Sequence, residues 1–320
     1  MKFPFTFDLA SIFRLFIPGF CLAIALDPIV AVAFNAIKVQ KSTEFYYGFG
    51  SVLLGWLISV LDMHIYMLYE GRRFWPPFFV RLGRKRERKR LDHLKKLCDD
   101  AKTTANPAIL PVEYEIQEAQ FPMNEAGQRD VTYPTRLGNL ITEYEQYPDV
   151  KYGMDGVFYW YRVWFAVPKD VRDELTQQQS IADSSVYISF VLFASSLLFI
   201  LYALLSILGL VQISPNLGIC WLFAAMLTLV CSYGFYEIAL QSHSTYGSFF
   251  KAMFDEFHTK IDVKPLLSNL ARRTGIDEYK LLDGPEAYKM AWRYLRWHNL
   301  RRPGEKKNVN AEELLQDSER

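Results

Sequence analysis

The chain has 320 residues, of which 51% are hydrophobic and 22% are charged, and its formal net charge is +1. A net charge so close to zero gives no reason to expect nucleic acid or an acidic partner, so any argument from charge must rest on local clusters. The four cysteines show no CxxC spacing, and we expect neither a disulfide framework nor a zinc site.

Four apolar stretches are long enough to cross a membrane. A hydrocarbon core of about 30 Å requires about 20 apolar helical residues, because backbone polar groups cannot bond to lipid. The stretches of this length are residues 15–37, 47–69, 186–211 and 217–240. The sequence therefore predicts a mainly α integral membrane protein, with four transmembrane helices in two hairpins plus a small, mostly helical cytoplasmic module. We expect no cleaved secretory signal, since Asp27-Pro28 interrupts the first apolar stretch.

A strongly basic segment follows the second stretch. Residues 72–96 hold eleven Lys or Arg against only Glu87 and Asp92, and loops of this kind stay in the cytoplasm. Both termini are therefore expected on the cytoplasmic side. Residues 74–79 are aromatic and proline-rich and fit an elbow at the headgroup level, followed by a basic helix over residues 81–97.

The basic helix is expected to contact anionic lipid headgroups. The residues expected to make that contact are Arg84, Lys85, Arg86, Arg88, Lys89 and Arg90. Nucleic acid is the less favoured partner, because no nucleic-acid recognition fold accompanies the charge.

The chain divides into six predicted segments. They are the first hairpin (1–71), the elbow and basic helix (72–100), an aromatic-rich cytoplasmic module (101–169), a stalk helix with the second hairpin (170–240), a cytoplasmic helical tail (241–302) and a disordered terminus (303–320). Within the module, alternating Val112, Tyr114 and Ile116 favour an extended segment, and helices are predicted over 136–147 and 156–165. No Gly or Pro lies between Val171 and Leu208, which predicts a stalk continuous with the third membrane helix.

One set of motifs resembles a known pattern. Residues 134–139 (PTRLGN), then Tyr152-Gly153-Met154-Asp155 with Arg162 and Pro168, and later Tyr246-Gly247 with residues 250–257, resemble a family of uncharacterised bacterial multipass membrane proteins. The resemblance covers roughly residues 134–297 and implies a bacterial inner-membrane protein with paired helices around a cytoplasmic module. It implies no activity.

Polar residues inside the first hairpin are candidates for function. An ionised Asp27 within a membrane helix requires a partner, and it indicates either an ion or proton path, a polar interface in an oligomer, or a break in a shorter helix. Asp62 and His64 lie at the depth of Arg14, which favours a buried Arg14–Asp62 pair that fixes packing. A proton relay or pH sensor at His64 is the alternative.

A second candidate site lies in the aromatic module. Arg136, Tyr152, Asp155 and Arg162 fit a pocket in which arginines bind a phosphate or carboxylate and aromatic rings stack on a ligand. A structural Arg–Asp salt bridge is the favoured reading of the same residues.

The sequence contains none of the motifs HExxH, GxSxG, Walker A, GxGxxG or EF-hand, and its five histidines show no metal-ligand spacing. We therefore expect a protein without cofactor or catalytic residues. The favoured function is an oligomeric membrane scaffold or pore-type effector in bacterial stress or anti-phage defence, whose module senses a ligand or protein partner. A proton- or ion-coupled transporter or channel, and a membrane-surface enzyme acting on lipid or nucleotide, are the alternatives.

Overall fold

The computed structural model describes residues 12–36, 38, 42–103, 110–124, 127–208 and 215–297. Those residues are mainly helical and contain no β-strand. The chain forms two compact units: unit 1 comprises Met1–Gln146 and Val167–Met253, and unit 2 comprises Tyr147–Ala166 and Phe254–Arg320. The terminus from residue 303, expected to be disordered, lies outside the described residues.

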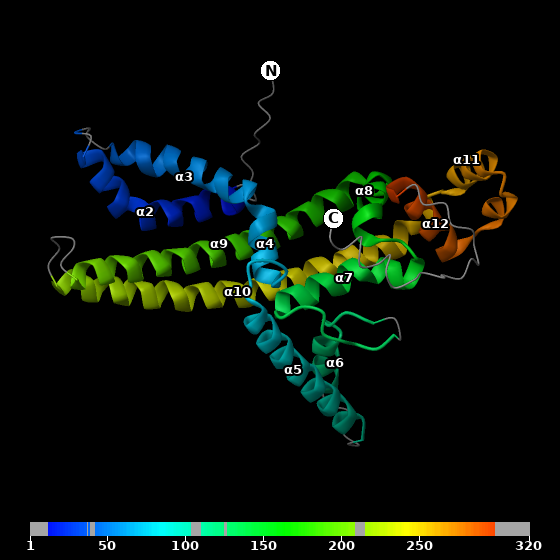
Figure 1. The fold of residues 1–320 in the computed structure, drawn as a ribbon, viewed down its shortest axis with the longest axis horizontal. Coiled ribbons are helices and arrows are strands. Elements are labelled where there is room, and N and C mark those ends of the chain that lie inside the picture. Colours follow the sequence, from blue (N-terminus) through cyan, green and yellow to red (C-terminus); the bar gives the residue numbers. More distant parts are fainter. Residues whose placement is uncertain are drawn as a thin grey trace. The chain divides into compact units, whose positions relative to one another are not determined.

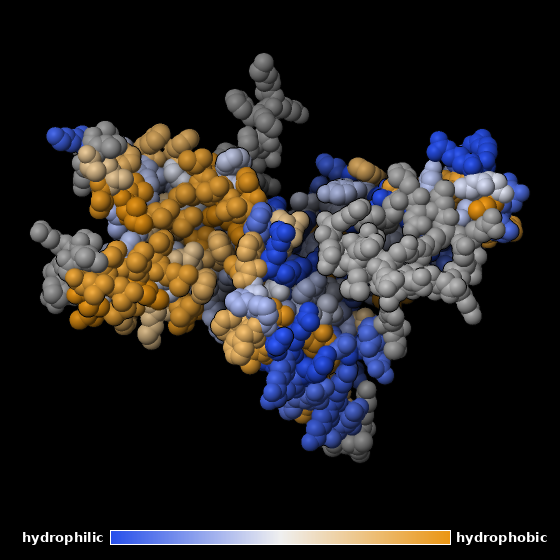
Figure 2. Space-filling model, in the orientation of Figure 1, coloured by the Kyte–Doolittle hydropathy of each residue, from blue (hydrophilic) through white to orange (hydrophobic). Residues whose placement is uncertain are grey.

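Unit 1 contains the helices that can cross a membrane. Three are long and apolar enough by themselves: residues 14–34, which include most of α2 (Ile17–Ala36), then α9 (Lys169–Ile207) and α10 (Pro215–Phe257). Apolar side chains cover the surface of α2, α3 and the neighbouring parts of α9 and α10 (Figure 2). Such a surface is stable in lipid and would be unfavourable in water, which confirms the membrane-protein class.

The second predicted membrane helix is bent. It consists of α3 (Thr43–Val60) and α4 (Asp62–Glu70), which meet at an angle of 59°. Neither Gly nor Pro marks the bend, but Leu61 leaves helical geometry and Asp62 begins the next helix. In the part of the chain that the structure describes, three to four helices can therefore span a membrane, and the fourth is this bent pair.

Glycines bring α3 into close contact with α2 and with the helical segment Ile12–Phe16 that precedes it. A Cβ atom on Gly19 would overlap the Ser51 carbonyl, and one on Gly55 would overlap the Leu15 carbonyl. Small residues allow such close approach, which supplies the packing energy that the hydrophobic effect cannot supply between helices in lipid.

Hydroxyl groups join the second hairpin, whose helices α9 and α10 run side by side (Figure 1). Ser189 Oγ donates to the Ser232 carbonyl at 2.9 Å, and Ser232 Oγ donates back to the Ser189 carbonyl at 2.8 Å. Further along, Ser196 Oγ donates to the Ala225 carbonyl. The helix α9 has no break over its 39 residues, as the absence of Gly and Pro predicts.

The extended segment predicted around Tyr114 is wrong. Residues Leu110–Glu118 form helix α6, which packs against the long basic helix α5 (Pro77–Thr103). Tyr114 contacts the core formed by Leu91, Leu94, Phe121 and Val131, whereas Ile116 is 56% exposed. The apolar alternation therefore does not mark one buried face.

Unit 2 is a small helical body. It contains the end of α7 (Arg136–Tyr152), α8 (Gly156–Ala166), α11 (Lys264–Thr274) and α12 (Gly284–Trp297). Its core consists of Leu267, Leu270, Ala271, Tyr279, Ala287 and Met290. The turn after α7 needs Gly153, since its φ is +70° and a Cβ there would lie 2.5 Å from the Pro285 carbonyl oxygen.

Candidate functional site

The PTRLGN motif forms the amino-terminal end of α7. Thr135 Oγ1 accepts a hydrogen bond from the Gly138 amide at 3.0 Å, which caps the helix. Asn139, only 1% exposed, holds the preceding turn. Its Oδ1 accepts from the amides of Thr132 (3.0 Å) and Tyr133 (2.9 Å). Its Nδ2 donates to the carbonyls of Tyr133 (3.0 Å) and Thr135 (2.9 Å), so all four hydrogen-bonding positions of this amide are used.

Close backbone contacts attach this motif to the end of the first hairpin. A Cβ on Gly138 would lie 2.5 Å from the Glu70 carbonyl oxygen, and one on Gly83 would lie 2.6 Å from the Pro134 carbonyl oxygen. Gly71 has a φ of +75° and abuts the Pro134 ring. The motif therefore packs directly against the end of α4 and the second turn of α5.

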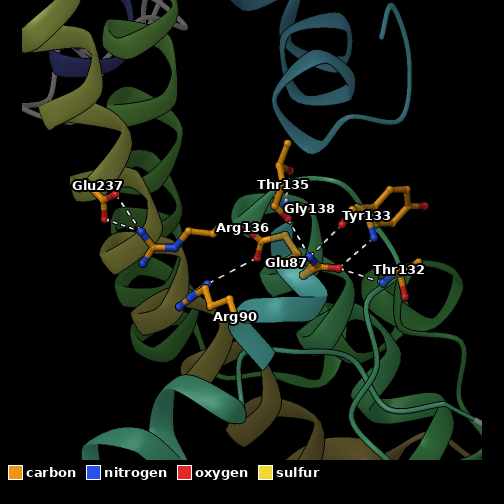
Figure 3. Close-up of polar contacts among 9 residues, drawn as sticks. Glu87, Arg90, Thr132, Tyr133, Thr135, Arg136, Gly138 and Glu237 are labelled. Atoms are coloured by element: carbon orange, nitrogen blue, oxygen red, sulfur yellow. Dashed lines mark hydrogen bonds and ion pairs between the residues drawn. The ribbon is translucent and has the colours of Figure 1, made fainter. Parts of the chain in front are cut away.

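Five charged residues gather beside the motif. Arg136 Nη1 donates to both carboxylate oxygens of Glu237 on α10, at 2.8 and 2.9 Å (Figure 3). Arg90 Nη1 lies 3.6 Å from Glu87 Oε2 on α5, and Arg86 interacts electrostatically with Glu87. Burial raises the pKa of the Glu87 carboxyl, and the charges of Arg90 and Arg136 oppose that increase. We call Arg86, Glu87, Arg90, Arg136 and Glu237 the arginine cluster.

A second polar group lies among the membrane helices. Asp183 on α9 is 5% exposed, and its Oδ2 lies 3.1 Å from Arg14 Nη2. The Tyr66 hydroxyl donates to Asp183 Oδ1 at 2.6 Å and lies 3.1 Å from His243 Nε2. The Tyr144 hydroxyl lies 3.4 Å from His243 Nδ1. This Asp183 cluster joins the start of the first membrane segment to α4, α7, α9 and α10.

The residues predicted in the first hairpin have other partners than expected. Arg14 pairs with Asp183, whereas Asp62 accepts a hydrogen bond from the Tyr187 hydroxyl at 2.7 Å. His64 is exposed beside Phe74, with ring centroids 6.4 Å apart. Asp27 is half-buried in α2 and hydrogen-bonds with the Tyr47 side chain.

The four residues predicted to form the module site are divided between the two units. Arg136 belongs to unit 1 and binds Glu237, while the other three belong to unit 2. Asp155 Oδ1 accepts from the Phe158 amide at 2.7 Å and caps α8. Arg162 Nη1 donates to the Phe158 carbonyl at 2.9 Å and covers its ring, so local contacts take the place of the favoured Arg–Asp bridge. The Tyr152 hydroxyl donates to Asp255.

Unit 2 has a cavity of about 660 Å³. Its lining includes Lys151, Tyr152, His258, Asp262, Lys264 and Tyr288. The rings of Tyr152 and His258 stack at 4.0 Å, and hydrogen bonds to Tyr147 and Asp255 raise the pKa of Lys151. The lining thus offers charges of both signs beside aromatic rings.

The predictions from sequence missed Asp183, Tyr66, Tyr144 and His243. A signal was present for Asp183, because an acid one turn before an uninterrupted apolar run must find a partner near the membrane. Within the described ranges, no group of three or more His, Cys, Asp or Glu side chains is placed to bind a metal. Comparisons of the chain with protein-family models, curated proteins and solved structures give no match, so its function is inferred from the residues themselves.

Proposed function

We propose that this protein is a non-enzymatic, oligomeric membrane effector of the scaffold or pore type, in which the Asp183 cluster holds one of two arrangements of the membrane helices. The observation that carries the proposal is the ion pair between Arg14 and the almost fully buried Asp183. Unit 2, with its cavity, is the part that senses a ligand or partner.

A buried ion pair is an unusual way to hold helices together. Removing two charges from water costs several kcal/mol. Their mutual attraction returns about the same amount, so such a pair adds little net stability. It does penalise arrangements that separate the partners, because the Asp183 carboxylate, whose side chain is 7% exposed, would then be buried without a countercharge. Asp183 and its hydrogen-bonding neighbours come from separate helices, which makes the cluster a suitable element for a switch between two packings.

Several copies of the chain are needed for a scaffold or a pore. Three to four spanning helices are few for enclosing a polar path within one chain. The exposed apolar side chains of α3 and α10, among them Trp56, Phe223 and Met226, offer surface for lipid or for a second copy.

The proposed setting is a bacterial inner membrane with both termini in the cytoplasm. The eleven basic residues between 72 and 96 support this orientation through the positive-inside rule. A role in stress or anti-phage defence is consistent with such an effector.

Mass measurement of the full chain in lipid nanodiscs tests the proposal. The expected result is a complex of at least two copies of the 37.3 kDa chain that persists on dilution. The Asp183→Asn variant should shift that complex toward smaller species, whereas Asp173→Asn, an exposed site on the same helix, should leave it unchanged. A monomer at every concentration would contradict the oligomer.

A further inference from the structure

We propose that unit 1 binds one anionic phospholipid, whose acyl chain lies in a groove between α4, α9 and α10 and whose phosphate lies beside Arg86. This proposal assigns a specific binding site to the anionic lipid that the basic helix is expected to contact. It rests on the proposed insertion into a membrane and does not require oligomers.

The groove has a volume of about 350 Å³. Its lining consists of Tyr69, Ser189, Phe193, Leu229, Ser232, Tyr233 and Tyr236. The hydroxyls within it are already bonded inside the protein: Tyr69 lies 3.0 Å from Ser189, and Ser189 and Ser232 bond each other's carbonyls. The groove therefore offers rings and aliphatic carbon to its occupant, which fits an acyl chain.

Packing of an acyl chain does not select one lipid over another. A chain in the groove is no better shielded from water than a chain in bulk lipid, so the hydrophobic effect contributes little to the choice. Selection must come from the polar end of the lipid, and the charges at that end of the groove decide which headgroup binds.

Tyr233 lines one end of the groove, and the arginine cluster lies at that end. The Tyr233 hydroxyl hydrogen-bonds Glu237 and interacts electrostatically with Arg136 and Arg86. The cluster has three guanidinium groups and two carboxylates. Arg136 pairs with Glu237, and Arg90 pairs with Glu87. Among the described residues no carboxylate lies within ion-pair distance of Arg86, although Glu87 interacts with it electrostatically. Three guanidinium groups against two carboxylates leave the cluster with one excess positive charge.

The position of this charge along the helices matches a headgroup. Tyr233 and Glu237 lie where the apolar part of α10 ends, and α5 begins with exposed Phe78 and Phe79, residues typical of the membrane interface. Arginine binds phosphate through paired N–H donors, and the Arg86 side chain is exposed and able to do so. A zwitterionic headgroup carries its own cation, which competes with Arg86 for the phosphate. A lipid with net negative charge is therefore favoured.

Native mass spectrometry of the full chain, released from nanodiscs of equimolar phosphatidylglycerol and phosphatidylcholine, tests the site. The expected result is one phosphatidylglycerol retained per chain in preference to phosphatidylcholine. Arg86→Gln should lower this preference about fivefold, the effect of one basic residue near an anionic surface. The matched control is Lys85→Gln, which removes the same charge from an exposed neighbour whose side chain leaves α5 about 100° away.

A second pair of variants tests the groove. Leu229→Trp fills it and should reduce lipid retention, whereas Leu227→Trp, on the same helix but outside the groove lining, should not. Added glycerol 3-phosphate should fail to displace the lipid, because it lacks the acyl chain. Equal losses from Arg86→Gln and Lys85→Gln, no preference for phosphatidylglycerol, or full displacement by glycerol 3-phosphate would each overturn the proposal. The same spectrum counts the protein copies, so a monomer that retains the lipid refutes only the oligomer.

Discussion

Replacing Asp183 with alanine should lower the free energy of unfolding by about 2–3 kcal/mol, less than the roughly 3–5 kcal/mol of a fully buried ion pair, because the Arg14 side chain is 34% exposed. The substitution leaves the Arg14 guanidinium without its carboxylate, and it removes the acceptor of the Tyr66 hydroxyl. Reversible unfolding in detergent micelles, followed by tryptophan fluorescence, measures the change. The control is Asp173→Ala on the exposed part of the same helix, which should cost less than about 0.5 kcal/mol.

A double substitution distinguishes the cost of leaving one charge unpaired from the contribution of the ion pair itself. Arg14→Met combined with Asp183→Leu removes both charges, so the double variant should be more stable than the sum of the single effects predicts. If the two single effects simply add, the pair seen in the structure does not contribute to the folded state. If the double variant folds but forms smaller assemblies, the cluster acts on helix arrangement beyond its effect on stability.

The second large effect is expected at the PTRLGN motif. Asn139→Asp keeps both acceptor contacts but loses the two donors that bond the carbonyls of Tyr133 and Thr135, and it buries a carboxylate facing them. The Thr135 carbonyl still accepts a hydrogen bond from the Asn139 backbone amide at 3.2 Å, but the Tyr133 carbonyl loses its side-chain donor. A buried group left unsatisfied costs about 1–3 kcal/mol, and the buried carboxylate adds to that loss. The same unfolding experiment measures this loss.

The matched control for the motif is Asn269→Asp on the exposed face of α11, where the change should be close to neutral. Proteolysis within residues 127–135 should also become faster in the Asn139→Asp variant, because the turn loses its anchor. Equal stability of the two variants would show that Asn139 does not hold the turn.

Hydropathy predicted the membrane class because lipid offers no hydrogen-bond partner to any backbone group. Each peptide unit in the hydrocarbon must bond within its own segment, so a long apolar run has few alternatives to a helix. The continuity of α9 was predictable for a similar reason, since nothing between Val171 and Leu208 breaks a helix. These features depend on local sequence alone.

The partners of the polar residues were not predictable from the sequence. Arg14 and Asp62 are at similar depth, but Arg14 forms its ion pair with Asp183, which lies more than a hundred residues away in the sequence. The partner of Arg14 depends on how the two hairpins pack against each other. The position of a residue along its own helix does not say which other helix faces it. Similarly, Arg136 was grouped with Asp155 by proximity in sequence, whereas the structure pairs it with Glu237 on a distant helix.

Site-directed labelling of single cysteines tests the central claim, which is that the hairpins cross a membrane and leave the basic helix and unit 2 on the same side. In a variant with Cys21, Cys98, Cys220 and Cys231 replaced, a membrane-impermeant maleimide should reach cysteines at Lys85 and Glu278 from the same face of sealed vesicles. A cysteine at Ser42, next to the link of the first hairpin, should react only from the opposite face. Labelling of Lys85 and Glu278 from opposite faces, or of Ser42 from the face that exposes Lys85, would contradict the account.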